Sequence, residues 1–252
     1  MQHIKSVTFG FILGVAAFGL PSLSAQAAIV ELISNGGFET GDFTGWTVNN
    51  TGSGGVFVDT PGTTTPTSGH LTSAAGGSAH GSFYAVTDQS GPGAHELSQS
   101  FTVAAGATSV LLSFDLFVND ADGGPLFAPG GLADGTSNGP NQHASVDIMA
   151  STDAVFQTLG LANFYLGVDA GADPHAFSTI TADITALVGG GGTFIFRLGE
   201  VDTQSFLNAG IDNVSILADQ AVVPIPAALP LFATAIAGLG FAGYRKRKSK
   251  VA

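Results

Sequence analysis

Short stretches in which apolar and polar residues alternate recur along the middle of the chain. The clearest is QSFTV, where Phe101 and Val103 fall on one face and Ser100 and Thr102 fall on the other. A period of two is the pattern of a half-buried β-strand. Comparable segments rich in Val, Ile, Phe and Thr lie at residues 53–60, 81–87, 109–118, 144–150, 162–168, 193–198 and 213–217.

Clusters of Gly, Asn, Asp, Pro and Ser separate these segments, and no helical repeat joins them. This rhythm of about ten short strands predicts an all-β domain over residues 28–220, a β-sandwich of the jelly-roll type. Residues 178–188 are ambiguous, because the pattern there also fits one helical turn. Residues 60–80 and 119–142 lack any period, and loops of that length are typically functional or disordered.

The first 27 residues have the parts of a secretory signal peptide. Lys5 precedes an uncharged apolar core, Val7 to Leu20, which is too short for a spanning helix but has the length of a signal h-region. Ala25 and Ala27 form an A-x-A site, so we expect signal peptidase to cleave after Ala27. The alternative is an uncleaved N-terminal anchor.

The chain closes with a second apolar segment, residues 221–250. Residues 227–244 are uncharged and would span about 27 Å as a helix, which predicts a short transmembrane helix. A basic tail follows, made of Arg245, Lys246, Arg247, Lys248 and Lys250. The positive-inside rule places such a tail in the cytoplasm and the β domain outside.

The order of a proline motif, a short apolar segment and a basic end closely resembles the PEP-CTERM sorting signal of Gram-negative bacteria that produce exopolysaccharide. Val223, Pro224 and Pro226 match the motif, whereas Ile225 stands where the family has Glu. The resemblance implies an exosortase-type sorting enzyme as partner, a transient membrane intermediate, and release to the cell surface or outside. A plain single-pass anchor is the alternative.

Charge is distributed unevenly between the ends and the body of the chain. The chain has 7 basic and 19 acidic residues, and Arg197 is the one basic residue between Glu31 and Asp219, the first and last acids. Such a body repels nucleic acid and anionic lipid, and it suits a hard cation such as calcium. A simple acidic, soluble surface is the other interpretation. The absence of cysteine excludes disulfides and thiolate metal sites.

Two short motifs resemble the ends of carbohydrate-binding-module and galactose-binding-like jelly rolls: NGGFETGDFTGW at 35–46 and AGIDNVSIL at 209–217. The resemblance implies a structural calcium where the first and last strands meet. Its ligands would be Glu39 and Asp212, with Asp42 and the main chain near Gly37 and Gly41. The alternative is that these acids only shape turns.

Candidate chemistry beyond calcium is sparse. Trp46 belongs to the first motif and is expected in the core, which leaves Tyr84, Tyr165 and Phe127 as candidate sugar platforms. No catalytic motif is present, and His95 and Glu96 are neighbours in an expected strand, where they face opposite ways. The sequence therefore favours a non-enzymatic surface or extracellular-matrix protein with polysaccharide as the candidate ligand. A surface polysaccharide hydrolase and a purely structural or adhesive protein stay open.

Overall fold

A computed structural model describes residues 27–69, 81–120, 131–132, 140–154, 156, 160–168, 173–203 and 206–221. Ala25, the sorting motif at residues 223–226, the expected span at 227–244 and the basic tail all lie outside these residues. In the part of the chain that is described, no helix is long and apolar enough to cross a bilayer. Signal cleavage, sorting and the span therefore stay predictions.

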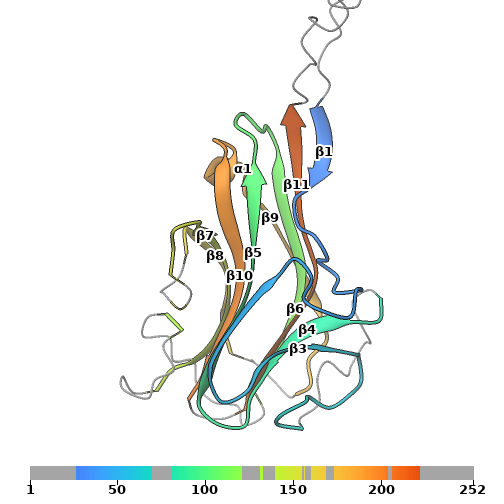
Figure 1. The fold of residues 1–252 in the computed structure, drawn as a ribbon, viewed down its shortest axis with the longest axis vertical. Coiled ribbons are helices and arrows are strands. Elements are labelled where there is room, and N and C mark those ends of the chain that lie inside the picture. The colour runs from blue at the N-terminus through green and yellow to red at the C-terminus, as the bar shows by residue number, and fades with distance from the viewer. Residues whose placement is uncertain are drawn as a thin grey trace, which may run out of the picture. The chain divides into compact units, whose positions relative to one another are not determined.

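The strands form two antiparallel sheets, as Figure 1 shows. Sheet A has the order β3-β4-β11-β6-β9, with β1 also pairing β11: β1 is Ala27–Glu31, β3 Gly55–Asp59, β4 Tyr84–Asp88, β6 Val110–Asp120, β9 Ser178–Asp183 and β11 Leu207–Ala221. Sheet B has the order β2-β5-β10-β7-β8: β2 is Thr47–Gly52, β5 Gly93–Val103, β7 Gln142–Ala150, β8 Ala162–Gly167 and β10 Gly192–Asp202. A short helix, α1, covers Thr185–Val188.

The pairing is that of a jelly roll. Strands β4, β5, β6 and β7 pair with β11, β10, β9 and β8 respectively, so the first half of this strand series folds back on the second. Rolling such a long hairpin places alternate pairs in opposite sheets. The structure thus confirms the all-β sandwich and the expected strand rhythm.

The core lies between the sheets, where the period of two directs the apolar side chains. In β6, Val110, Leu112, Phe114, Leu116 and Val118 all belong to the main buried cluster. Phe196 and Leu198 of β10 reach the same cluster from sheet B. Burial of apolar area is the main favourable contribution to folding. In this domain, the alternation of side chains along each strand places the apolar ones in the layer between the two sheets.

The ambiguous segment at 178–188 contains both predicted structures in turn. Strand β9 occupies Ser178–Asp183 and α1 follows directly at Thr185–Val188. Strands β1 and β2 were not expected from the pattern. The expected loop 119–142 is shorter at both ends, because β6 extends to Asp120 and β7 begins at Gln142.

Candidate functional site

A row of polar side chains crosses the outer face of sheet B. The strand registers place Thr47, Ser98, Arg197, Asp147 and Asn163 directly opposite one another, one from each of the five strands. The core residues Phe196 and Leu198 flank Arg197 in β10, so Arg197 and the row with it point away from the core. We call these five residues the polar row.

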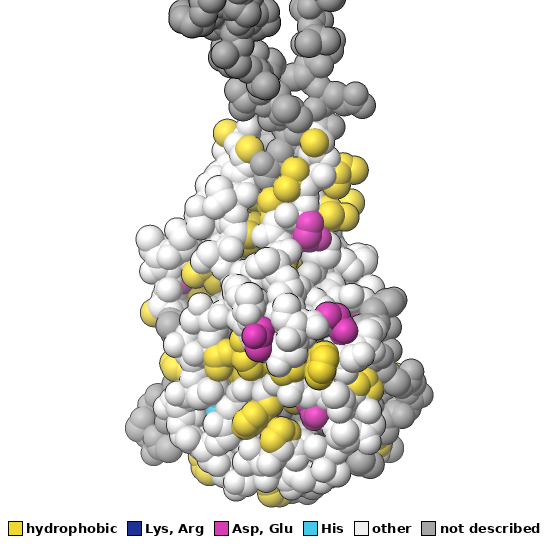
Figure 2. Space-filling model, turned by 45° about the vertical axis from the view of Figure 1, so that its right-hand side comes forward, with side chains coloured by type: hydrophobic (Ala, Val, Ile, Leu, Met, Phe, Trp, Pro, Cys, Tyr) yellow, Lys and Arg dark blue, Asp and Glu magenta, His cyan; other side chains and the backbone are white. Residues whose placement is uncertain are grey.

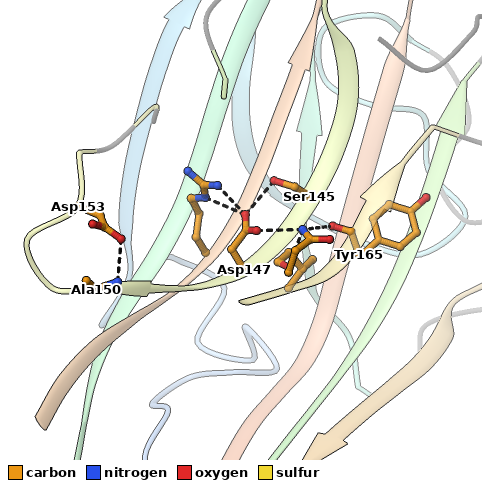
Figure 3. A network of polar contacts seen from close by, with 8 residues as sticks. Ser145, Asp147, Ala150, Asp153 and Tyr165 are labelled. Carbon is orange, nitrogen blue, oxygen red and sulfur yellow. Dashed lines mark hydrogen bonds and ion pairs between the residues drawn. The ribbon is translucent and has the colours of Figure 1, made fainter. Parts of the chain in front are cut away.

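The centre of the polar row is a buried ion pair. The Arg197 Nη2 and Nε atoms donate to Asp147 Oδ2 at 2.5 and 3.2 Å, and the two side chains are 1% and 0% exposed. Ser145 Oγ donates to the same oxygen at 3.0 Å, and Asn163 Nδ2 donates to Asp147 Oδ1 at 2.9 Å (Figure 3). Both carboxylate oxygens are thus satisfied, which a buried charge requires.

The amide of Asn163 is oriented by three hydrogen bonds from its Nδ2, the longest of them to Val146 O at 3.4 Å. Its Nδ2 donates to Asp147 Oδ1 and, at 2.7 Å, to the carbonyl of Tyr165 (Figure 3). These bonds use the two amide hydrogens, so Oδ1 of this exposed residue is presented as an acceptor. On the other side of the row, Glu96 Oε2 accepts from Asn49 Nδ2 at 2.9 Å. Burial raises the pKa of Glu96, and Asn49, Ser98 and the Arg197 charge partly offset that rise.

A second polar group lies between the sheets at the end where β10 finishes. Glu200 and Asp202 alternate with Leu198 and therefore point inward, and Glu200 is fully buried. Neither carboxylate oxygen of Glu200 makes a hydrogen bond of good geometry within the described part of the chain. Burial raises the pKa of Glu200 well above its usual value, with Asp202 and Asp88 adding repulsion and the Thr87 hydroxyl offsetting only part of the effect. The folded state therefore favours the protonated form of Glu200.

His95 is held neutral beside this group. Gln89 Nε2 donates to the carbonyl of Asp202 at 3.1 Å, which turns Gln89 Oε1 toward His95 Nε2 at 2.9 Å. The other ring nitrogen, Nδ1, lies 3.1 Å from Asn50 Oδ1. Burial lowers the pKa of His95 to about 4. This histidine had been placed in a strand from the sequence, but nothing there indicated its partners.

The structure brings together the two motifs that predicted calcium. The Val214 N–H donates to the Gly36 carbonyl at 2.9 Å, and a side chain at Gly36 would meet Val214 O at 1.9 Å. A Cβ at Gly37 would lie 3.7 Å from Asp212 Oδ1 and 3.8 Å from Glu39 Cγ. The two predicted acids therefore approach one point from sequence-distant segments.

The donor set at this point is nevertheless small for calcium. Glu39 Oε1 accepts the N–H groups of Ser82 and Phe83 at 2.9 and 3.0 Å, and the N–H of Asn213 donates to Asp212 Oδ1 at 2.7 Å. Asp42 closes an exposed turn through Thr44 N at 2.9 Å, away from a ligand role. Among the described residues no three acidic or histidine side chains group to hold a metal ion. These contacts do not make up the 6–8 oxygens that calcium takes, so the calcium site stays a prediction.

The other candidates of the first motif are structural. Gly41 has φ +75°, and its N–H bonds to Phe38 O at 2.9 Å in the same turn. Trp46 packs on Phe38 with ring centroids 5.3 Å apart, and its Nε1 donates to Asn35 O at 3.0 Å, which confirms the expected core role.

The candidate sugar platforms do not form an exposed aromatic surface in the described part of the chain. Tyr84 is fully buried, which excludes it as a platform. Tyr165 is half-buried, and its hydroxyl donates to Val168 O at 3.0 Å. Phe127 lies outside the described residues. The polar row was missed from the sequence, although the isolation of Arg197 among the acids was a signal for it.

No family model and no curated protein matches the sequence. Among solved structures the chain is similar to TmCBM61 in complex with β-1,4-galactotriose, at 12% identity over 74% of this chain and 97% of that one, with a TM-score of 0.44. It is also similar to the K1 cleaved adhesin domain of Lys-gingipain from Porphyromonas gingivalis, at 14% identity over 75% and 97% of the two chains and a TM-score of 0.43.

A third similar structure is the enzymatically active domain of tailspike protein 4 from bacteriophage CBA120, at 12% identity and a TM-score of 0.43. The match covers 75% of this chain and only 21% of that one. At these identities and scores the similarities carry no function to this chain. What its own residues define is an acidic, two-sheet β protein with a polar row on one sheet and a buried acid group between the two.

The ion pair of the polar row predicts strong coupling between Arg197 and Asp147. We expect Asp147→Leu to lower the free energy of unfolding by about 3–5 kcal/mol, because it leaves the buried guanidinium without its carboxylate. The double variant Asp147→Leu/Arg197→Met should recover most of that loss. Urea unfolding of the two single variants and the double variant measures this, and additive losses would contradict the coupling.

We expect the buried carboxyl group of Glu200 to lower the stability of the fold as the pH rises. The folded state keeps its proton at pH values where the unfolded chain has lost it, so stability decreases as pH rises above about 4.5. The loss is about 1.4 kcal/mol for each pH unit between the two pKa values. Glu200→Gln should therefore be more stable than the wild type at pH 8 and gain little at pH 4, as followed by thermal melting.

His95 supplies the matched control with the opposite sign. The unfolded histidine takes up a proton near pH 6.5 and the folded one only near 4, so its contribution is lost as pH falls between these values. His95→Gln should remove this loss of stability at falling pH without changing the loss that Glu200 causes at rising pH. Identical pH profiles for both variants and the wild type would refute the assignment of both groups.

Glu39 offers a test that separates a metal ligand from a structural acid. We expect Glu39→Ala to lower the free energy of unfolding by about 1–2 kcal/mol in EDTA and in calcium alike, because the lost bonds are to the N–H groups of Ser82 and Phe83. Asp42→Ala is the control within the same motif and should cost less. A loss that is seen only when calcium is present would instead establish the predicted calcium site.

Proposed function

We propose that this chain is an exported, surface-sorted and non-enzymatic matrix protein that binds polysaccharide along the polar row of sheet B. The observation that carries the proposal is the row itself, an uninterrupted line of polar side chains across all five strands. A polymer lying across the strands would meet the Thr47 hydroxyl at one end of the row and the Asn163 amide at the other, with Ser98, Arg197 and Asp147 buried between them. Such convergent polar groups are what orients a hydroxyl-rich ligand.

The ligand would contact the two exposed ends of the row. Thr47 and Asn163 are exposed, and Asn49 beside Thr47 is half-buried, whereas Arg197 and Asp147 are covered. The buried pair holds the Asn163 Nδ2 against the protein, which leaves its Oδ1 as the acceptor for a sugar hydroxyl. The ion pair therefore positions the binding group and does not touch the ligand. The acidic body favours a neutral polymer over an anionic one.

The carboxylates of this face support binding over hydrolysis. Glycoside hydrolysis needs two accessible carboxyl groups about 5–9.5 Å apart on either side of the scissile bond. Asp147 is buried and ion-paired, and Glu96 is 3% exposed and accepts a hydrogen bond from Asn49. Neither is free to reach a sugar, so a hydrolase would need a pair elsewhere.

Export and sorting rest on the terminal segments, and the strand ends agree with them. Ala27 of β1 pairs with Ala221 of β11, so the two described ends of the chain lie side by side (Figure 1). Cleavage after Ala27 would leave Ala28 to Glu31 to keep the pairing with β11. A single attachment point at this end would leave sheet B free to meet a matrix polymer.

Affinity electrophoresis in gels that contain a neutral polysaccharide tests the proposed binding. We expect Asn163→Ala to weaken retention about tenfold, since one hydrogen bond to the ligand is lost. Ser178→Ala, an exposed polar position in sheet A, is the matched control and should bind like the wild type. Equal retention of both variants would remove the polar row as the site. Release of reducing ends would favour the hydrolase, and no retention on any polymer would favour the structural or adhesive protein.

A further inference from the structure

One end of the sandwich exposes apolar side chains that the core does not use. Four of the five large hydrophobic residues that are exposed in the described part of the chain are Ile29, Val30, Leu111 and Leu217, which are 76%, 39%, 47% and 39% exposed. They lie on β1, β6 and β11 at the end where β1 pairs with β11. Figure 2 shows hydrophobic side chains gathered on this end of the molecule. The fifth, Leu161, precedes β8 in sheet B.

Three of the four share the outer face of sheet A. Leu217 lies directly opposite Leu111, and Ile29 lies opposite Asp219, two residues further along β11. A groove of about 370 Å³ continues this surface between β9 and β11, lined by Leu111, Leu217, Ser113 and Thr181 among others. We call Ile29, Leu111, Leu217 and this groove the apolar end.

The acids next to the apolar end are bound by their own chain. Glu31 Oε1 accepts the N–H groups of Ile33 and Ile216, both at 2.9 Å. Asp219 Oδ1 accepts two main-chain N–H groups at 2.7 and 2.6 Å, and Asp183 Oδ1 accepts one at 2.9 Å. The Thr185 hydroxyl and main chain lower the pKa of Asp183, and the Thr108 hydroxyl with the Ser109 main chain lowers the pKa of Asp219, so both stay charged while their oxygens turn toward the protein. The apolar side chains are left as the contact surface.

We propose that the apolar end rests on the surface of a lipid bilayer whose lipids are zwitterionic. The inference rests on the membrane intermediate of the proposed function, in which residues 227–244 span the bilayer. Only residues 222–226 separate Ala221 from that segment, and each step of chain covers at most about 3.6 Å. The end of β11 therefore lies within about 20 Å of the hydrocarbon, where exposed Ile and Leu side chains gain by leaving water.

The acidic residues beside the apolar end favour a bilayer over a second copy of the chain as the partner of this surface. Pairing two copies through the apolar end would bring Glu31, Asp183 and Asp219 of one copy against the same acids of the other, which is a repulsive arrangement. A zwitterionic surface presents no such cost. Anionic lipid would repel the same three carboxylates, so the contact should weaken as anionic lipid is added.

The chain has no cysteine, which allows single labels at chosen positions. Ile29→Cys, Leu217→Cys and the control Leu161→Cys, each in the full chain, are labelled with an environment-sensitive fluorophore and reconstituted in phosphatidylcholine vesicles. We expect labels at 29 and 217 to shift to shorter wavelength and to be quenched by nitroxide lipids. The label at 161 should do neither. Adding phosphatidylglycerol should reduce the shift at 29 and 217.

Flotation of the same samples separates this inference from the proposal on which it rests. A chain that floats with the vesicles while both labels stay in water overturns the apolar-end contact and leaves the anchoring standing. A chain that does not float overturns both. A shift that needs no vesicles and grows with protein concentration assigns the surface to a second copy instead. Leu111→Asp in the Leu217→Cys background should abolish the shift without changing flotation or the melting temperature.

Discussion

The pairing of Arg197 with Asp147 constrains the whole of sheet B. The two residues are buried on the outer face of the sheet, and they stand opposite each other in β10 and β7. Side chains alternate faces along a strand, so a slip of one residue would turn Arg197 into the apolar core and Phe196 out of it. The cost of an unpaired buried charge thus fixes the register of the central strand. The registers of β5 and β2 follow, because they pair outward from β10.

Sheet A is organised by close contact of the main chain, and the described residues of its strands contain no comparable charge pair. Strand β11 pairs with β1, β4 and β6, and the loop of the NGGFE motif packs against it. The approach at Gly36 leaves no room for a Cβ, and Phe117 covers Gly210 in the same way. The NGGFE motif, which suggested a ligand site from the sequence, therefore has a packing role: it joins the first and last strands of the domain.

The strands were predicted correctly where the alternation of apolar and polar residues was strong. The prediction failed where the composition of a segment concealed that pattern. Strand β6 was predicted because residues 109–118 are apolar enough for a core strand, and five of its apolar residues do lie in the core. Strand β2, TVNNTG, was missed because it is a polar edge strand, and β1 was missed because it directly follows the expected signal peptide. Strand β5 begins at Gly93 and therefore includes His95 and Glu96, which were expected in a strand with opposite facing; His95 points inward and Glu96 outward, each toward polar partners.

Site residues were harder to predict, because their partners are set by strand order. Arg197 was visible as an isolated cation, but its pairing with Asp147 requires β10 and β7 to be neighbours in the sheet. The same holds for Glu200, whose sequence context gives no sign that a carboxyl group will be fully buried. Asp115 shows the reverse case. A buried acid within a core strand needs partners, and here Asn213 Nδ2 donates to it at 3.0 Å and the Thr179 hydroxyl at 2.5 Å.

The two ends of the domain, taken along its strands, differ in which side chains they bury and which they expose. Strand β11 runs from Leu207, opposite Asp120, to Ala221, opposite Ala27. The first end buries Glu200, Asp202 and His95 between the sheets, and the second end exposes Ile29 and Leu217. Burying acids and exposing aliphatic side chains both oppose stability in water, so neither distribution is explained by folding alone. A domain held at one end against a lipid surface would account for the exposed aliphatic end, since the side chains there are then no longer in water.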